Sequence, residues 1–360
     1  MKALWSKLSF ATVICVLLSG CAQPGPPLPP SLELPKPPSD LRAGRKGNRV
    51  TLTWSEPTRT TDRQTMRYLG PTRICRSLQA EMKECGSPVA QVPSAPRATQ
   101  PSQVTQTQTF SDTLPATIQE QNPTGDVTYA VEVLNRDGRS AGLSNRVSVP
   151  AAPTLPPPAD FHADLTANGV EFTWTNTATP SALPGVQYRY RIYRHDEGTG
   201  KDSIATEVPI GEAIPMHAQD TGFEWEKTYL YRITAVTIVS RPGVEAQVEG
   251  DDSAEVRIVA HDVFPPAVPS GLQAVYSGEG QKPFVDLIWA PVTDADLAGY
   301  NVYRREGEAA PIKLNSDLIK APSCRDGAVM PGKKYFYSVS AVDLRGNESA
   351  RSDEASETVP

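Results

Sequence analysis

The sequence contains few residues of the types that most often hold metals, with four histidines and five cysteines among 360 residues. A zinc site needs Cys or His ligands in closely spaced pairs, and the histidines here are scattered one at a time. The chain also lacks a Gly-x-Ser-x-Gly nucleophile elbow and a glycine-rich phosphate-binding loop. We therefore expect no metal, no cofactor and no enzymatic activity.

Two acidic pairs provide the alternative to that expectation. Asp251 with Asp252, and Asp294 with Asp296, offer the carboxylates that a calcium site or a paired-carboxylate catalyst would need. Both pairs fall in predicted loops, where Asp side chains commonly bond to nearby backbone N–H groups. We expect these residues to form turns.

Continuous blocks of positive charge are absent as well. The formal net charge is −6, whereas nucleic-acid binding depends on clustered Lys and Arg. The segment 188–194 alternates basic and aromatic residues, and we expect it to be a strand with an outward ladder of Tyr or Arg side chains. Nucleic acid is therefore excluded as a predicted partner.

Proline, by contrast, is abundant. The 35 prolines among 360 residues are nearly twice the usual share of about 5%, which disfavours long helices and favours turns, strand edges and stiff linkers. With 39% hydrophobic and 21% charged residues the composition is that of a globular protein. The length predicts two to four domains.

The first twenty residues have the features of a secretory signal. Lys2 and Lys7 precede an apolar run, residues 8–18, that is too short to span a bilayer. The run ends in Leu18-Ser19-Gly20-Cys21, which resembles the lipobox of bacterial lipoproteins. The resemblance implies cleavage after residue 20 and diacylation of the Cys21 thiol, with attached palmitate-type chains. The alternative is an ordinary secreted protein whose cleavage site happens to precede a cysteine.

The residue after the lipobox bears on localisation. In lipoproteins of diderm bacteria an Asp at this position would favour the inner membrane, and this chain has Ala22. The resemblance therefore implies an outer-membrane lipoprotein, with either the periplasm or the medium facing its domains. Residues 21–36 are proline-rich and predict a tether in polyproline II conformation. The alternative for residues 25–30 is a motif that docks on a partner.

One proline-led segment occurs three times, at residues 38–43, 158–163 and 269–274. Each copy is followed by an alternating segment that ends in tryptophan, and a period of two places its apolar residues on one face of a strand. These tryptophans are Trp54, Trp174 and Trp289. We expect them to fill three hydrophobic cores, because one buried aromatic removes a large apolar area from water.

Three further markers follow in the same order in every copy. The first is an aliphatic residue two positions before an arginine, and the second is an apolar residue two positions before an aspartate. The third is an alternating segment that we align on its first tyrosine. The arginines are Arg76, Arg194 and Arg304; the aspartates are Asp112, Asp220 and Asp326; the aligned tyrosines are Tyr129, Tyr229 and Tyr335.

Short alternating strands over about a hundred residues are typical of antiparallel β-sandwiches. All three copies resemble fibronectin type III domains, an immunoglobulin-like fold, and the third matches best. The resemblance implies an all-β chain with domains at residues 37–150, 154–260 and 264–360, the first of them divergent. It also implies that Tyr335 is a tyrosine-corner residue, whose hydroxyl bonds to the chain a few residues upstream.

The five cysteines divide by position. Cys15 lies in the signal and Cys21 in the lipobox, so three remain in the exported domains. Cys75 and Cys85 are ten residues apart and flank a predicted hairpin, so an oxidising compartment favours a disulfide between them. Cys324 is expected to be a small buried hydrophobe.

Two aromatic residues lie outside the repeated pattern. Phe223 and Trp225 fall at a predicted turn, where they either contact a sugar face or a protein, or cover the end of the second core. They are the weak binding candidates.

We predict a non-catalytic, membrane-anchored protein of the cell envelope, acting as a protein-binding scaffold or adhesion rod. The alternative is a carbohydrate-binding lipoprotein that supports polysaccharide breakdown, which would need exposed, coplanar aromatics. The predicted partners are the membrane, through Cys21, and an envelope protein, with a glycan as the alternative.

Overall fold

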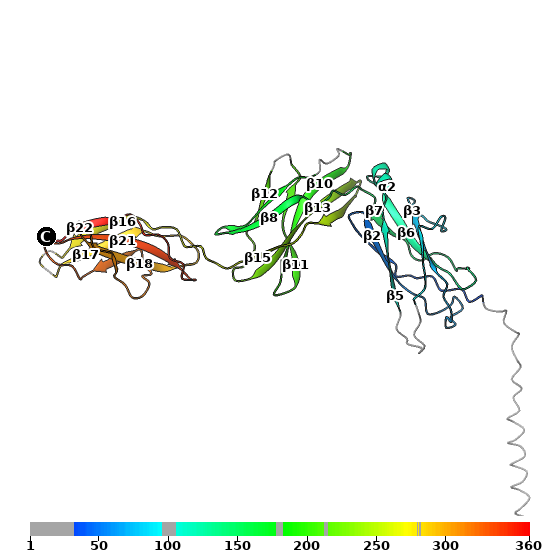
Figure 1. Ribbon diagram of the computed structural model, residues 1–360, viewed down its shortest axis with the longest axis horizontal. Helices are drawn as coiled ribbons and strands as arrows, with labels where there is room; N and C mark the ends of the chain where they lie inside the picture. Colours follow the sequence, from blue (N-terminus) through cyan, green and yellow to red (C-terminus); the bar gives the residue numbers. More distant parts are fainter. Residues whose placement is uncertain (1–31, 96–105, 178–182, 212–214, 279, 281) are drawn as a thin grey trace, which may run out of the picture. The chain divides into compact units, whose positions relative to one another are not determined.

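The computed structural model describes residues 32–95, 106–177, 183–211, 215–278, 280 and 282–360 (Figure 1). The predicted signal, Cys21 and most of the predicted tether lie outside these residues. The chain divides into two compact units, Met1–Ala152 and Pro153–Pro360. Among the described residues, no helix is long and apolar enough to cross a membrane.

The first unit contains one sandwich of two antiparallel sheets. One sheet consists of β1 (Arg42–Lys46), β2 (Arg49–Ser55) and β5 (Thr107–Thr113). The other has the order β4 (Ala90–Val92), β3 (Thr72–Ser77), β6 (Asp126–Val133) and β7 (Val147–Pro150). Along β2 the residues Val50, Leu52 and Trp54 are buried and alternate with less buried neighbours. The period of two read from the sequence is therefore the one that builds this core.

The second unit contains two sandwiches, drawn in green and in yellow to red in Figure 1. The second domain pairs β8 (Ala159–Thr166), β9 (Gly169–Thr175) and β12 (Met216–Asp220) in one sheet, and β10 (Val186–Asp196), β11 (Lys201–Pro209), β13 (Thr228–Arg241), β14 (Val244–Asp252) and β15 (Val256–Val259) in the other. In the third domain one sheet consists of β16 (Ser270–Ser277), β17 (Phe284–Ala290) and β20 (Ser323–Asp326). The other sheet consists of β18 (Leu297–Glu306), β19 (Ile312–Lys313), β21 (Lys334–Asp343) and β22 (Ala355–Thr358).

Each sandwich has its own hydrophobic core. Trp54, Trp174 and Trp289 are buried in three separate clusters, as the alternation predicts. Each cluster draws its buried members from both sheets of its own sandwich, which is the arrangement expected of aligned β-sandwiches. The structure is therefore all-β, with three sandwiches of the immunoglobulin-like type.

Tyrosine corners are present in the second and third domains. The backbone N–H of Met330 donates to the Tyr335 hydroxyl at 3.0 Å, and that of Glu224 donates to the Tyr229 hydroxyl at the same distance. Both bonds reach five residues upstream of the tyrosine. Tyr335 therefore has the role that the resemblance implies.

The sequence alignment of the first domain is wrong by two residues. Tyr129 lies opposite Arg76 on the neighbouring strand, and the equivalent partners in the later domains are Tyr231 and Tyr337. Val127, rather than Tyr129, thus stands where Tyr229 and Tyr335 stand. A shift of two residues keeps a side chain on the same face of a strand, so alternation alone does not reveal the error.

The first domain closes its end with a short helix where the others have a tyrosine corner. Helix α2 (Ala116–Gln121) buries Gln119, which donates to the Leu114 carbonyl at 2.9 Å and accepts from the Arg45 guanidinium at 3.0 Å. Burial lowers the pKa of Arg45 to about 10. In the first domain the helix and these polar contacts stand where the later domains have the tyrosine corner.

Candidate functional site

The same three-residue group recurs inside every sandwich. An arginine guanidinium donates to an aspartate Oδ2, at 2.7 Å in the first domain, 2.9 Å in the second and 2.7 Å in the third. A tyrosine hydroxyl donates to the same oxygen, at 2.7, 3.0 and 3.0 Å. The groups are Arg76–Asp112–Tyr129, Arg194–Asp220–Tyr231 and Arg304–Asp326–Tyr337.

Burial and the nearby aspartate raise the pKa of the three phenols, Tyr129, Tyr231 and Tyr337, far above their ordinary value. Each phenol therefore stays protonated and donates permanently to its carboxylate. The aspartate lies on one sheet and its arginine and tyrosine lie on the other, so the charge-assisted bonds hold the two sheets together. The repeated acids and tyrosines thus have a structural role in each sandwich.

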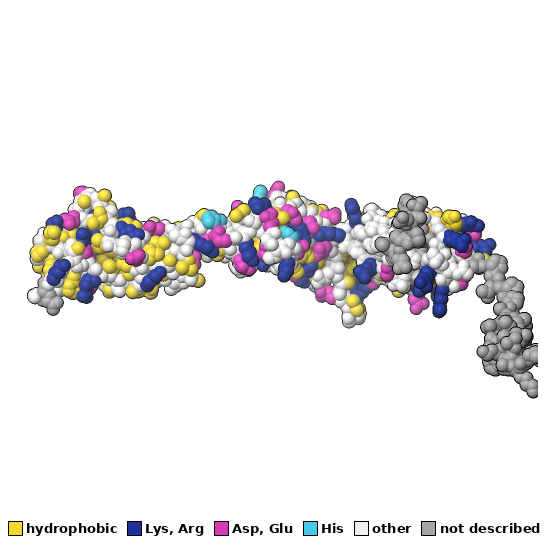
Figure 2. Space-filling model, turned by 90° about the horizontal axis from the view of Figure 1, so that it is seen from below, with side chains coloured by type: hydrophobic (Ala, Val, Ile, Leu, Met, Phe, Trp, Pro, Cys, Tyr) yellow, Lys and Arg dark blue, Asp and Glu magenta, His cyan; other side chains and the backbone are white. Residues whose placement is uncertain are grey.

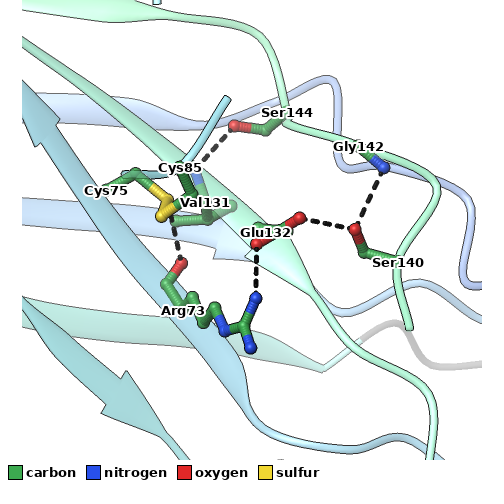
Figure 3. Close-up of a disulfide and its surroundings, with 8 residues drawn as sticks. All are labelled: Arg73, Cys75, Cys85, Val131, Glu132, Ser140, Gly142 and Ser144. Atoms are coloured by element: carbon green, nitrogen blue, oxygen red, sulfur yellow. Dashed lines mark hydrogen bonds and ion pairs between the residues drawn. A yellow bond between two sulfur atoms is a disulfide. The ribbon is translucent and has the colours of Figure 1, made fainter. Parts of the chain in front are cut away.

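A disulfide joins Cys75 and Cys85, as the sequence predicts, with their Cα atoms 5.3 Å apart (Figure 3). Cys75 lies on the face of β3 that points away from the core, and it packs with Met82 and Ala130. Arg146 donates to the Met82 carbonyl through Nε at 3.0 Å and Nη2 at 2.7 Å. The loop after β3 is therefore fastened to the outer surface of the sheet at two points.

That surface carries a further chain of polar contacts (Figure 3). Glu132 on β6 accepts from Arg73 at 3.2 Å and from the Ser140 hydroxyl at 2.5 Å. The disulfide loop borders a hollow of about 650 Å³ with a mixed polar lining, which includes both acids and bases. Nothing in that lining favours one class of ligand.

Removing the disulfide is expected to lower the free energy of unfolding of the first domain by about 2–3 kcal/mol, because the closed loop restricts the unfolded chain. The variant Cys75→Ser/Cys85→Ser should show this loss in urea unfolding. Adding a reductant should destabilise the wild type to a similar extent and leave the double variant unchanged. Equal stability of wild type and variant would contradict the prediction.

Phe223 and Trp225, the weak binding candidates, form a packed group. Their rings lie 4.8 Å apart between centroids at 79° to each other, and Trp225 contacts Phe264 at 6.0 Å and 50°. Both are partly buried against the second core. Since the rings share no plane, this pair lacks the flat platform that a sugar face would need, and its geometry is that of a core cover.

The segment 188–194 forms part of β10, but the expected outward ladder is only half correct. Tyr190 is buried in the core and Arg194 reaches Asp220 in the interior. Arg189, Arg191 and Tyr193 face outward, because successive side chains of a strand alternate between its faces.

Arginines occupy the outward aromatic faces of the second and third domains. Arg232 lies 4.7 Å from the centroid of the Tyr193 ring, Arg351 lies 4.1 Å from that of Tyr303, and Arg305 covers Phe336 at 4.0 Å. Cation–π contacts of this kind use the ring face that a sugar would otherwise stack on.

Arg191 donates hydrogen bonds to several acceptors on the same surface. It donates to Glu207 at 2.6 Å, to Glu249 at 2.8 Å and to Gln247 at 2.8 Å. Burial raises the pKa of Glu207, but hydrogen bonds from Arg189 and Arg191 outweigh it and hold that pKa below its ordinary value. The charged side chains of this surface are therefore paired with one another.

Three carboxylates meet where the second and third domains join along the chain. One oxygen from each of Asp262, Asp296 and Asp343 lies within 4.8 Å of the other two. Asp343 accepts from the backbone N–H groups of Arg345 and Asn347, and Asp262 accepts from that of Phe264. The sequence pattern pointed to Asp296 but not to the other two, which are distant in the chain. Two of these acids form turns, the role expected of loop aspartates.

Comparison with known proteins gave no matching family profile. The curated relatives include amylopullulanase of Thermoanaerobacterium saccharolyticum, 38% identical over 91 residues, which are 25% of this chain and 7% of that protein. Amylopullulanase of Thermoanaerobacterium thermosulfurigenes is 36% identical over 94 residues, 26% of this chain and 5% of its own length. The chain thus spans less than a tenth of the length of these relatives.

Two solved structures are also similar. An Fn3-like protein from Clostridium thermocellum is 32% identical, over 27% of this chain and 96% of its own, with a TM-score of 0.23. The FN1–FN3 domains of chicken CNTN1 are 15% identical, over 91% of this chain and 100% of their own, with a TM-score of 0.26. The paired antiparallel sheets, the buried tryptophans and the tyrosine corners identify the chain as a protein built of fibronectin type III-like domains.

Proposed function

We propose that the chain is a lipid-anchored protein of the cell envelope that acts without catalysis, as a scaffold for another protein. The observation that carries this proposal is the repeated Arg–Asp–Tyr group, in which a buried aspartate of each sandwich is bonded to an arginine and a tyrosine and stabilises the fold. Domains of this kind bind through loops and sheet edges rather than through a reactive cleft. The anchor is Cys21, on the lipobox resemblance.

The second domain offers a sheet edge suited to such binding. Strand β11 lies at the end of its sheet and has nine residues, several of them exposed. Ile204 on this strand is an exposed apolar side chain. An unpaired edge can accept an additional strand from a partner, with backbone hydrogen bonds giving affinity and side chains giving specificity.

Site-directed photocrosslinking in intact cells tests the scaffold. A photoreactive residue at Ile204 is expected to capture one reproducible protein, and the same residue at exposed Val275 on β16 serves as the matched control. The captured protein should bind the purified chain in vitro and should be lost when Cys21 is replaced by alanine. Recovery of the chain alone from both positions would argue against a protein scaffold.

The second candidate is carbohydrate binding in support of polysaccharide breakdown, and the similarity to amylopullulanases favours it. Affinity electrophoresis in gels containing amylose or pullulan tests this candidate directly. Retardation by either polysaccharide, reversed by soluble oligosaccharide, would support it. Unchanged mobility in both gels, together with a negative glycan array, would exclude it.

A further inference from the structure

Positive charge is concentrated in the first domain. Residues 32–152 contain fifteen Lys and Arg against eleven Asp and Glu, whereas residues 153–262 contain eight against seventeen. The net charge is therefore +4 in the first region and −9 in the second. Figure 2 shows several Lys and Arg side chains, in dark blue, along the visible face of the first domain.

Four of these cations lie on the segment that enters the domain and on the hairpin that follows, and they lack partners among the described residues. Lys36, Arg59, Arg63 and Arg67, called here the basic cluster, are exposed, and no described residue forms an ion pair or hydrogen bond with their side chains. In the second domain, by contrast, most cations are paired with carboxylates. Charges left unpaired in this way are available to an external anion.

A hydrogen-bonded hairpin fixes the positions of the basic cluster. The Thr60 N–H donates to the Gln64 carbonyl at 2.9 Å, and the Met66 N–H donates to the Thr58 carbonyl at 2.9 Å. Thr60 and Met66 are themselves buried. Arg63, at the turn, has a φ of 66°, in the left-handed region that non-glycine residues seldom adopt. Such a conformation persists only where the surrounding structure holds it.

The segment that enters the first domain lies against this hairpin. The Lys36 N–H donates to the Arg59 carbonyl at 3.0 Å, and the Thr61 N–H donates to the Leu34 carbonyl at 3.0 Å. Lys36, Arg59 and Arg63 thereby line one open hollow of about 450 Å³, together with Thr60 and Thr61. Of the nearby acids, Asp62 accepts a hydrogen bond from the Thr60 hydroxyl, and Glu33 also has an interaction partner.

Two exposed apolar side chains lie at the same end of the domain. Leu32 is 58% exposed and Tyr68 is 63% exposed. The Leu32 carbonyl accepts from Asn135, and Gly70, two residues after Tyr68, donates its N–H to the adjacent Leu134 carbonyl. Tyrosine beside basic residues is typical of side chains that rest at the headgroup level of a bilayer.

We propose that the basic cluster, with Leu32 and Tyr68, docks the first domain on an anionic phospholipid surface. Lys36, Arg59 and Arg63 hold lipid phosphate groups in their shared hollow, and the two apolar side chains enter the headgroup layer. The proposal rests on the proposed anchor for bringing the domain to the membrane. Cys21 precedes Leu32 by eleven residues, which is a reach of at most about 40 Å.

The anchor makes a weak site sufficient. A tethered domain meets the lipid surface at a high effective concentration, so a contact of low intrinsic affinity is still occupied. One basic residue near an anionic surface strengthens association by about fivefold. Two of the four cations therefore account for about a 25-fold change in affinity.

Vesicle flotation tests the proposal without the anchor. Residues 21–360 carrying Cys21→Ser are mixed at low ionic strength with vesicles of phosphatidylcholine, with or without phosphatidylglycerol. The chain is expected to float only with phosphatidylglycerol, and salt should weaken the binding. The variant Arg59→Ala/Arg63→Ala should bind about 25-fold more weakly.

A matched control removes two other exposed cations of the same domain, as Arg49→Ala/Lys83→Ala, and should bind as the unsubstituted chain does. Circular dichroism and thermal unfolding should be the same for both variants, since all four side chains are exposed. Equal losses in the two variants would show a net-charge effect and overturn the site. Equal flotation with pure phosphatidylcholine, or none with either vesicle, would also overturn it.

The result of the flotation experiment does not depend on acylation of Cys21. Absence of acylation at Cys21 would refute the proposed function and leave the flotation result intact. Loss of a captured protein partner on Arg59→Ala/Arg63→Ala, with vesicle binding unchanged, would assign the cluster to a protein and overturn the lipid proposal.

Discussion

Replacing Asp326 with alanine is expected to lower the free energy of unfolding of the third domain by about 3–5 kcal/mol. The side chain of Asp326 is only 3% exposed, and it accepts from Arg304 at 2.7 Å and from Tyr337 at 3.0 Å. Its removal takes the carboxylate from the largely buried Arg304 guanidinium, which keeps only the Ala328 carbonyl as an acceptor, and leaves the buried Tyr337 hydroxyl without one. This is far more costly than losing an exposed pair. A loss of this size is a large part of the total stability of a typical domain.

Asp286 provides the matched control in the same domain. It pairs with Arg325 at 2.7 Å, but both side chains are exposed. Asp286→Ala should therefore cost less than about 1 kcal/mol. Hydrogen exchange followed by mass spectrometry resolves both effects by segment. Similar losses of protection in the two variants would show that the buried group has no special role.

The damage from Asp326→Ala should remain within the third domain. The three cores share no buried residue, so protection of the strands around Trp54 and Trp174 should not change. Loss of protection in the first domain as well would contradict the independence of the cores.

Replacing Cys21 with serine is expected to abolish membrane association of the full chain. Burial of an acyl chain contributes about 0.8 kcal/mol per CH₂, so two or three chains make residence effectively permanent and their absence releases the protein. Cells fed radiolabelled palmitate should label the wild type and not the variant. Fractionation should move the variant from the membrane to the soluble fraction.

Cys15→Ala is the control, because Cys15 lies within the predicted signal and leaves the lipobox intact. That variant should keep both its label and its membrane association. Labelled Cys21→Ser protein in the membrane fraction would refute the lipobox assignment. The basic cluster alone is too weak to produce that result at physiological salt.

The sequence was sufficient for the fold because the fold depends on local alternation. Trp54, Trp174 and Trp289 each end a strand whose apolar residues share one face, and this pattern is visible without any tertiary information. The alignment of Tyr129 failed for the same reason. Period two cannot distinguish positions two residues apart, and only the pairing with Arg76 fixes the register.

The sequence alone could not predict sites whose residues come from distant segments and meet only in the folded chain. Lys36 and Arg59 come together through an isolated pairing of Pro35 with Thr60, and no spacing rule predicts such a contact. Asp262 and Asp343 likewise meet Asp296 only after folding. The absence of a continuous basic block was correctly read from the chain, but it concealed a basic surface that the fold creates.

The spacing of the cysteines also governs the order of oxidation. On the proposed export route the chain emerges from its N-terminus, so Cys75 and Cys85 reach the oxidising compartment long before Cys324. The two are ten residues apart, and loop closure favours their encounter over one with Cys324, 239 residues beyond Cys85, by about a hundredfold. The native disulfide therefore forms before a competing thiol arrives, and Cys324 is left to fold, half-buried, as a free cysteine.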